Sequence, residues 1–278
     1  MEPVTDWVAL WAQLVEMQAK SHPEWHGREK VDVWKTRARN YDALVKNRWS
    51  KPDSSRAFIA ADLEAAPGST ALDIGAGTGA WSMFMARHAS RVTALEPSTA
   101  MLGILRENLA REGVTNVDFV QGEWPAADVP EHDISLCSHA MYGVADFPAF
   151  IRRMEAATRR RCYLVLRVPT PDGVMAEAAR RVWGQPHDSP NFQVAYNALL
   201  QMGVCANVLM EDSGLWSPWT SESLEEAVAD IKRRLDVGET SGHDAFLWDL
   251  VERRLTPSED GYTWPPGVRS ALVYWDVA

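Results

Sequence analysis

Hydrophobic and polar residues follow two different periods along this chain, and the change between them divides the sequence into three parts. In the first part, apolar side chains recur every three to four residues, which predicts helices over 5–21, 31–47 and 54–64. From residue 70 to 168, short apolar runs alternate with amphipathic stretches. Beyond residue 170 the pattern loosens into helices, strands and polar loops. The middle part is therefore expected to hold the most regular structure.

The middle part consists of alternating strand and helix patterns. Helices are predicted over 80–89, 99–112 and 147–158, and strands over 70–74, 91–96, 117–121, 134–138 and 162–168. The last of these strands is almost continuously apolar, as strands buried on both faces are. This alternation predicts an α/β fold with a doubly wound, mostly parallel sheet.

The C-terminal part contains less regular patterns. Ser223 and Glu226 have the spacing of a capping box, which predicts the start of a helix. We expect helices over 175–183, 193–202, 223–235 and 244–254, strands over 204–211 and 269–277, and a loop over 257–267.

These patterns predict one core domain with additions at both ends. The expected parts are a helical cap (1–60), a Rossmann-like core (61–169) and a C-terminal part (170–278). The C-terminal part is expected to complete the sheet with 204–211 and 269–277 and to place lid insertions over about 170–192 and 212–266.

Composition narrows the choice of partners. The chain of 278 residues has a formal net charge of −10, which disfavours binding to a phosphate polyanion. Cys137, Cys162 and Cys205 have no metal-site or redox spacing, and we expect all three to be buried core residues in a reducing compartment. No leader pattern and no long apolar run are present, so we expect a cytoplasmic monomer or homodimer that binds neither nucleic acid, membrane nor metal.

The most informative stretch is "ALDIGAGTGAWS" at residues 71–82, where an apolar strand leads into three alternating glycines. The loop also matches the G-x-G-x-x-A pattern of dinucleotide-binding proteins, and Glu96 lies at a fitting distance. However, Asp73 lies two residues before the first glycine, where a carboxylate would repel a pyrophosphate. S-adenosylmethionine (SAM) carries an ammonium and a sulfonium but no phosphate, and it suits this loop better. A P-loop is excluded because no Gly-Lys-Ser/Thr follows.

Four motifs in order make the region from about residue 70 to 168 resemble the class I SAM-dependent methyltransferases. "LDIGAGTG" is similar to the first motif of that family, "ALEPSTAML" to the second, "VDFVQGEWP" to the third, and "DISLCSHAMYGVAD" to the fourth strand and its loop. The resemblance covers a little over a third of the chain. It implies a seven-stranded sheet with an antiparallel last strand, and SAM as the methyl donor.

The resemblance also implies roles for single residues. Asp73 is expected near the methionine ammonium, and Glu96 is expected to bind the ribose hydroxyls. The other implied cofactor contacts are Gly75, Ala76, Gly77, Thr78 and Gly79 along the methionine and ribose, Pro97 and Met101 beside the adenine, Gly122, Glu123 and Trp124 around the adenine edge, and Ser138 and His139 on the sulfonium side. Glu123 departs from the family, which more often has Asp there.

Methyl transfer requires alignment and exclusion of water more than it requires a fixed catalytic group. His139 is the best candidate for a general base, because it follows the fourth strand and titrates near neutrality. Tyr142 could orient an acceptor in the same pocket. The "SHAM" sequence at 138–141 lacks the Asn-Pro-Pro-aromatic run of enzymes that methylate planar base or amide nitrogens.

The 13 tryptophans lie mainly outside the middle part of the chain, as a lid would require. Tyr41 stands in "RARNYD", which resembles a segment that closes over SAM in small-molecule methyltransferases. We expect an aromatic, lid-covered cavity that involves Trp34, Tyr41, Trp49, Trp216 and Trp219.

The sequence thus predicts a SAM-dependent methyltransferase that acts on an oxygen, nitrogen, sulfur or carbon atom of a small molecule. Two alternatives stay open: a methyltransferase of protein or tRNA, and a SAM-fold protein that binds SAM without catalysis or catalyses another reaction. An NAD-dependent dehydrogenase is a more distant third.

Overall fold

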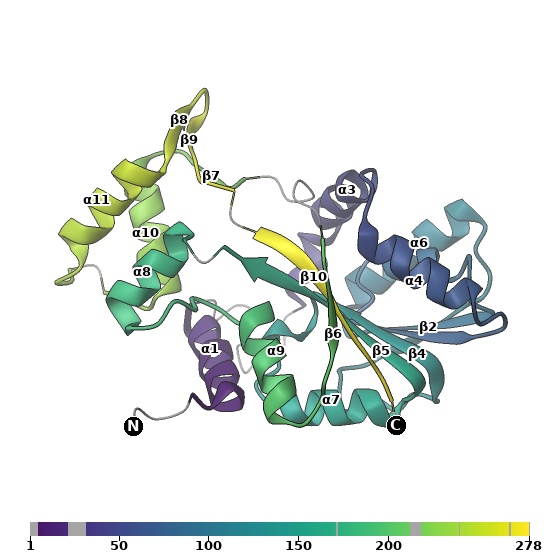
Figure 1. The fold of residues 1–278 in the computed structure, drawn as a ribbon. Helices are drawn as coiled ribbons and strands as arrows, with labels where there is room; N and C mark the ends of the chain where they lie inside the picture. The colour runs from purple at the N-terminus through teal and green to yellow at the C-terminus, as the bar shows by residue number, and fades with distance from the viewer. Residues whose placement is uncertain are drawn as a thin grey trace.

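The computed structural model describes residues 5–21, 32–170, 172–211, 218–238, 240–266 and 268–277. Its centre is a seven-stranded sheet in the order β3-β2-β1-β4-β5-β10-β6 (Figure 1). Six strands run in one direction, and β10 runs antiparallel to both of its neighbours, β5 and β6. The strands are β1 (Thr70–Ile74), β2 (Arg91–Glu96), β3 (Val117–Gln121), β4 (His132–Ser138), β5 (Thr158–Pro169), β6 (Asn207–Met210) and β10 (Val268–Asp276). This arrangement confirms the predicted doubly wound sheet with an antiparallel closing strand.

Helices cover both faces of the sheet, so the central strands are buried on two sides. One core unites the sheet with helices α1 (Trp7–Ser21), α7 (Phe147–Ala156) and α9 (Phe192–Gln201). On the opposite face, smaller clusters join it to α4 (Ser54–Glu64), α5 (Ala80–Met85) and α6 (Thr99–Glu112). Burial on both faces accounts for the apolar runs of the parallel strands.

The strand order places the functional edge of the molecule. The chain proceeds outward through β1, β2 and β3 and then returns to β4, which pairs with β1. In open α/β sheets, ligands bind where the strand order reverses, outside the carboxyl ends of the strands. The segments that follow β1, β2 and β4 meet at this edge.

A second lobe lies to one side of this edge (Figure 1). Its own hydrophobic core is formed by α8 (Val174–Trp183), α10 (Leu224–Arg234) and α11 (Asp244–Arg254). A three-stranded sheet, in the order β7-β9-β8, belongs to the lobe; its strands are β7 (Thr220–Ser221), β8 (Thr256–Ser258) and β9 (Gly261–Thr263). No helix in the part of the chain that the structure describes is long and apolar enough to cross a membrane.

Several sequence predictions need correction. The helix expected over 31–47 is a short η1 (Val33–Lys35) followed by α3 (Ala38–Trp49). The loop expected over 257–267 contains the β8–β9 hairpin, whose Asp260-Gly261 step is a turn signal that the prediction passed over. Cys137 and Cys162 are buried as expected, but Cys205 is exposed, because it precedes β6 in a segment without regular structure. Trp216 lies outside the described residues.

Candidate active site

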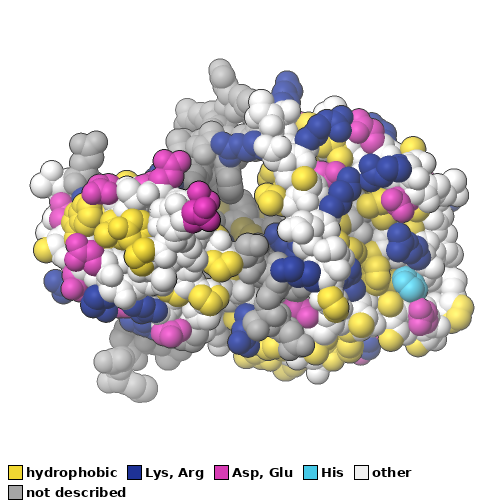
Figure 2. Space-filling view, turned by 90° about the horizontal axis from the view of Figure 1, so that it is seen from above, with side chains coloured by type: hydrophobic (Ala, Val, Ile, Leu, Met, Phe, Trp, Pro, Cys, Tyr) yellow, Lys and Arg dark blue, Asp and Glu magenta, His cyan; other side chains and the backbone are white. Residues whose placement is uncertain are grey.

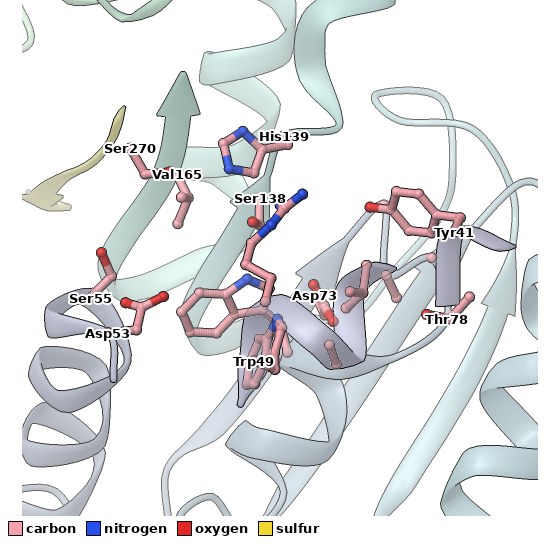
Figure 3. A pocket seen from close by; sticks show the side chains of 17 residues that line it. Tyr41, Trp49, Asp53, Ser55, Asp73, Thr78, Ser138, His139, Val165 and Ser270 are labelled. Carbon is pink, nitrogen blue, oxygen red and sulfur yellow. The ribbon is translucent and has the colours of Figure 1, made fainter. Parts of the chain in front are cut away.

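A cavity at the carboxyl edge of the sheet brings together residues from distant parts of the chain. Its walls come from the glycine loop, from the end of α3 and the start of α4, and from the ends of β4, β5 and β10. Eight residues of the predicted site line it: Tyr41, Asp73, Gly75, Ala76, Gly77, Thr78, Ser138 and His139. Figure 3 shows Tyr41, Asp73 and Thr78 around one end of the cavity and Asp53, Ser55, Val165 and Ser270 around the other.

Two glycines of the loop, Gly75 and Gly77, have left-handed backbone conformations but different surroundings. Gly75 has a φ of +73°, and a Cβ added there would lie 2.3 Å from the Cβ of Ala140, in the loop after β4. Gly77 has a φ of +56°, and its added Cβ would come no closer than 3.8 Å to any atom, the nearest being in the Tyr41 ring. Gly75 is therefore required by packing, whereas Gly77 is required by its backbone conformation and leaves the loop open to a ligand.

Asp73 is the fully buried carboxyl group of the cavity. Its Oδ2 accepts a 2.5 Å hydrogen bond from the Ser82 hydroxyl, and its side chain forms no ion pair with a Lys or Arg of the described residues. Burial, together with the nearby Glu96, raises the pKa of Asp73 to about 7, and the Ser82 hydrogen bond opposes this shift. A ligand cation beside Asp73 would supply the missing positive charge.

Glu96, at the end of β2, forms the second acidic position. Its carboxylate accepts hydrogen bonds from the backbone N–H groups of Gly77 and Ser98, both at 2.9 Å. Burial raises the pKa of Glu96, while these two hydrogen bonds lower it. The carboxylate thus connects the glycine loop to the turn after β2, and its oxygens have lone pairs left for further donors.

Helix α3 covers the glycine loop and is fixed to it by a buried amide. The Asn108 side chain donates 2.9 Å hydrogen bonds to the Asp42 carboxylate and to the backbone oxygen of Thr78. Tyr41 contacts Trp34, with ring centroids 5.2 Å apart, and lies over Gly77. The neighbouring Tyr41 and Asp42 therefore have separate roles, one over the cavity and one as an anchor.

Aromatic rings close another side of the cavity. Trp49 and Trp81 both line it and pack edge to face, with ring centroids 5.1 Å apart. Phe84 contacts both rings, and the Arg56 guanidinium lies 4.6 Å from the centre of the Trp49 ring. Trp81 accordingly belongs to both the cavity wall and an aromatic cluster.

His139 occupies the end of β4 in an uncommon backbone conformation. Its φ of +56° is left-handed, which for a residue other than glycine indicates a constrained position. Its Nδ1 lies 3.1 Å from the Tyr142 hydroxyl, and that hydroxyl accepts a 2.6 Å hydrogen bond from the backbone N–H of Arg167. Burial is the main cause that lowers the pKa of His139 to about 3, so the imidazole is neutral near pH 7.

The low pKa of His139 bears on its predicted role as a general base. A base with a pKa near 3 takes up a proton at neutral pH only weakly. The geometry instead suits a neutral imidazole that makes fixed hydrogen bonds. His139 also lines a second, larger cavity, which Tyr142 shares.

Other predicted site residues lie outside the cavity wall. Met101 is buried against Trp34 and Tyr41, as a helix core residue. Trp124 packs in the main core, and its indole N–H donates to the backbone oxygen of Phe150 at 3.2 Å. The predicted contact of the Trp124 ring with adenine is thus replaced by a packing role. Gly79 begins α5, Gly122 follows β3, and Pro97 and Glu123 are exposed near Glu96.

Some residues of the site were not predicted from the sequence. Asp32 accepts a 2.8 Å hydrogen bond from Ser98 and thereby holds the segment before α3 next to Glu96. Additional cavity residues are Arg48, Asp53, Ser55, Val165 and Ser270. Ser270 could have been anticipated, because the start of an antiparallel closing strand lies at the carboxyl edge of its parallel neighbours.

Comparisons with known proteins agree with this geometry. Residues 71–161 match the family model of a methyltransferase domain. Residues 71–161 therefore form a methyltransferase domain. The match begins at β1 and ends within β5, so it includes the glycine loop, Glu96 and His139.

Solved structures and a curated relative extend the likeness beyond the methyltransferase domain. The YcgJ protein of Bacillus subtilis shares the fold with a TM-score of 0.53 and 16% identity, over 80% of this chain and 97% of that one. A Bacillus halodurans protein assigned as a methyltransferase has a TM-score of 0.52 and 12% identity, over 80% of this chain and 98% of that one. An uncharacterized protein of Haemophilus influenzae is 25% identical over 241 residues, which is 84% of this chain and 86% of that protein.

Proposed function

We propose that this protein transfers a methyl group from SAM to a small-molecule acceptor, and that the cavity at the carboxyl edge of the sheet holds the donor. The observation that carries the proposal is the fully buried Asp73 carboxyl, which has no cationic partner among the described residues and lies next to the glycine loop in the cavity wall. A cationic ligand without phosphate satisfies that carboxyl. A pyrophosphate would be repelled by the carboxylates of Asp73 and Glu96.

The residues present fit SAM at three points. Asp73 would bind the methionine ammonium, and Arg48, which lines the same cavity, would bind the methionine carboxylate. Glu96 would accept hydrogen bonds from the ribose hydroxyls, because its carboxylate already joins the loop to the turn after β2. Tyr41 would cover the bound donor. The predicted adenine contacts of Pro97, Gly122 and Glu123 remain part of this proposal.

Bound SAM supplies an activated methyl group on a sulfonium, so the protein has to hold the acceptor in line and keep water out. Trp49 and Trp81 close the donor cavity on one side. His139 is the wall shared by the two cavities, and together with Tyr142 it would orient the acceptor. A neutral His139 also avoids placing a second positive charge beside the sulfonium.

The second cavity supports a small molecule as the acceptor. Its volume of about 640 Å³ lies within the range of small-molecule sites. It lies between the sheet and the lobe of α8, α10 and α11. We propose that this lobe is the lid that the sequence predicted in the C-terminal part of the chain. The chain's net charge of −10 is unfavourable for a tRNA substrate.

A turnover assay tests the proposal. Full-length protein is incubated with SAM and a fraction of cell extract restricted to small molecules, and S-adenosylhomocysteine is quantified. We expect protein-dependent product that Glu96→Ala abolishes and that Arg152→Gln, an exposed change on α7, leaves intact. The protein fraction and the tRNA fraction of the same extract are assayed in parallel. Product formed only with one of these two fractions would contradict the small-molecule acceptor, and no product with any of the three fractions would contradict the methyltransferase activity.

A further inference from the structure

The second cavity carries an inference about the acceptor, which rests on the function proposed above. It is enclosed by the ends of β5 and β10, the start of α8, the loop at 188–189 and the lobe residues Pro218, Trp219 and 264–266. His139 lines both cavities and forms the border with the donor cavity, and Tyr142 lies beside it in the second cavity. An acceptor in this cavity therefore has its reacting atom near His139 and its remaining parts against the other walls.

Two arginines give one wall a positive charge. The Arg167 guanidinium donates through Nη2 to the Ser189 hydroxyl at 2.6 Å and to the Pro190 backbone oxygen at 3.3 Å. It also lies 5.4 Å from the centre of the Tyr142 ring. Its Nε and Nη1 form no hydrogen bond with the rest of the described chain, so donors remain available.

Arg269, at the start of β10, lines the same cavity, and neither it nor Arg167 has a carboxylate within ion-pair distance among residues that the structure describes. One acid, Asp188, also lies in the wall. Two arginines and one aspartate leave this wall with a net charge of 2 − 1 = +1. The positive wall contrasts with the acidic chain as a whole. Figure 2 shows Lys and Arg side chains beside the hollow between the sheet and the lobe.

The wall on the side of the lobe is apolar and consists of aromatic and proline rings. Trp219 and Trp264 pack edge to face, with centroids 6.0 Å apart, and Pro218, Pro265 and Pro266 extend the surface. The Trp264 indole N–H donates to the Ser221 hydroxyl at 2.9 Å, and the ring, which is only 4% exposed, also belongs to the core of the lobe. Trp219 is 38% exposed; the Arg234 guanidinium lies 4.3 Å from the centre of its ring, so a ligand would contact the part of the ring that Arg234 leaves exposed. Rigid rings of this kind bind flat apolar groups at a small cost in side-chain entropy.

We infer that the methyl acceptor is a ring-containing anion, with an apolar aromatic or alicyclic body against Trp219 and Trp264 and a carboxylate or phosphate group on Arg167 and Arg269. Guanidinium groups bind both kinds of anion through paired hydrogen bonds. The opposed walls hold the two ends of such a molecule and thereby direct a third position toward His139. The volume of the cavity admits a molecule of two or three fused rings.

The test uses three probes of the same shape: 2-naphthoate, 2-naphthyl phosphate and the neutral 2-naphthalenemethanol. Each is titrated into the full-length protein, with and without S-adenosylhomocysteine, and binding is followed by ligand-observed NMR. We expect one or both anions to bind about tenfold more tightly than the alcohol. The carboxylate and phosphate probes identify which anion the site prefers.

Variants separate the two walls. Arg269→Gln and Arg167→Gln should each weaken the anions about tenfold and leave the alcohol unchanged, whereas Trp219→Ala should weaken all three probes alike. The matched control is Arg152→Gln, which lies on the exposed face of α7 and should change nothing. If the anions bind no more tightly than the alcohol, or if both arginine variants keep the anion preference, the inference is wrong.

The same samples distinguish this inference from the proposed function. S-Adenosylhomocysteine is titrated by calorimetry into each variant, and Arg269→Gln is expected to bind it as the unaltered protein does. If the unaltered protein binds S-adenosylhomocysteine but shows no preference for the anions over the alcohol, only the inference is overturned. Absence of S-adenosylhomocysteine binding in the unaltered protein overturns the proposed function.

Discussion

The two cavities on either side of His139 are built in opposite ways. The donor cavity is acidic, and its core comes from one short segment, the loop of residues 75–79 with Asp73 before it. The second cavity is basic and aromatic, and its walls come from segments as distant as 167–176 and 264–269. The first is held by close backbone approach, and the second by packing between the sheet and a lobe with its own core.

This difference indicates where function is fixed and where it can vary. A site made of a tight loop and buried acids tolerates little change, because a Cβ added at Gly75 or Gly79 would lie within 2.6 Å of a neighbouring side chain. A site lined by exposed side chains of a lid can change its specificity without disturbing the fold. The predictions below test that contrast, beginning with the change that should matter most.

Gly75→Ala should eliminate the donor site. The added Cβ would lie 2.3 Å from the Ala140 Cβ in a left-handed conformation, so either the glycine loop or the loop after β4 must move. We expect no measurable SAM binding by calorimetry and a lowered unfolding temperature. Gly103→Ala is the matched control, because nothing lies within 4 Å of its added Cβ and its place inside α6 favours Ala by about 0.5–1 kcal/mol. Normal SAM binding by Gly75→Ala would contradict the close approach.

Glu96→Gln should weaken SAM binding about tenfold or more. The carboxylate is expected to accept hydrogen bonds from both ribose hydroxyls, whereas the amide carries no charge and keeps only one acceptor oxygen. Glu123→Gln should have an effect below about threefold, because that side chain is exposed. Calorimetry on the two variants checks the ranking. Equal losses of SAM affinity in the two variants would show that Glu96 does not bind the ribose.

SAM affinity should fall as the pH drops below 7. The pKa of Asp73 is about 7 in the free protein, and a cation favours the ionised carboxylate, so binding must release a proton at lower pH. The expected loss approaches about tenfold per pH unit well below pH 7. Calorimetry at pH 6 in buffers of different ionisation enthalpy measures the released proton. Asp73→Asn should bind weakly and without this pH dependence; an unchanged slope in that variant would assign the proton to another group.

The same pKa has the opposite consequence for the stability of the free protein. The folded-state pKa of Asp73 lies above its unfolded value of 3.8. The contribution of Asp73 to the free energy of unfolding is therefore fully present below about pH 4 and is lost as the pH rises through 7. Saturation with SAM should remove this loss. Chemical denaturation between pH 5 and 8 measures the stability of the protein with and without SAM. In the free protein, Asp73→Asn should make stability less dependent on pH. An unchanged pH dependence in this variant would show that Asp73 does not cause the loss.

Asn108→Ala should release α3 from the glycine loop and weaken SAM binding by roughly threefold to tenfold, because its amide nitrogen donates both to Asp42 of α3 and to the Thr78 backbone oxygen, and its Oδ1 accepts from Lys46 of α3. The neighbouring Glu107 also connects α6 to α3 through an ion pair with Arg39, but both side chains are largely exposed. Glu107→Ala should therefore leave the affinity nearly unchanged. Similar effects of the two variants, measured by calorimetry, would contradict a specific anchor at Asn108.

His139 should show the smallest response to pH. Because burial holds its pKa near 3, its imidazole should stay neutral from pH 8 to pH 5. Nitrogen-15 NMR of labelled histidine, with the signal assigned by its absence in His139→Gln, measures this directly. Titration with a midpoint above 5 would restore the general base that the sequence suggested.

The fold and the donor half of the site were largely predictable from the sequence. Asp73, Gly75 and Gly77 lie within one loop, and the distance along the chain from this loop to Glu96 is set by one helix and one strand. Local spacing therefore determines their geometry. The parallel strands were predictable for a related reason, because burial on both faces produces apolar runs.

The rest of the site depends on tertiary packing, which local patterns do not contain. The predicted single aromatic cavity is in fact divided: Trp49 lines the donor cavity, Trp219 the second cavity, and Trp34 neither. Trp124 lies within the third motif, but contacts with α7, Phe150 among them, hold its ring in the main core. Arg167 and Arg269 lie about a hundred residues apart and line the same cavity because β5 and β10 pair, with Arg269 opposite Val168.

The most direct test of the central claim is a calorimetric titration of the unaltered protein with SAM and with NAD, side by side at pH 7.5. The claim is that the glycine loop and its two acids hold a cation that carries no phosphate. It predicts saturable SAM binding with one site per chain and no heat of binding from NAD. Saturable binding of NAD without binding of SAM would contradict it.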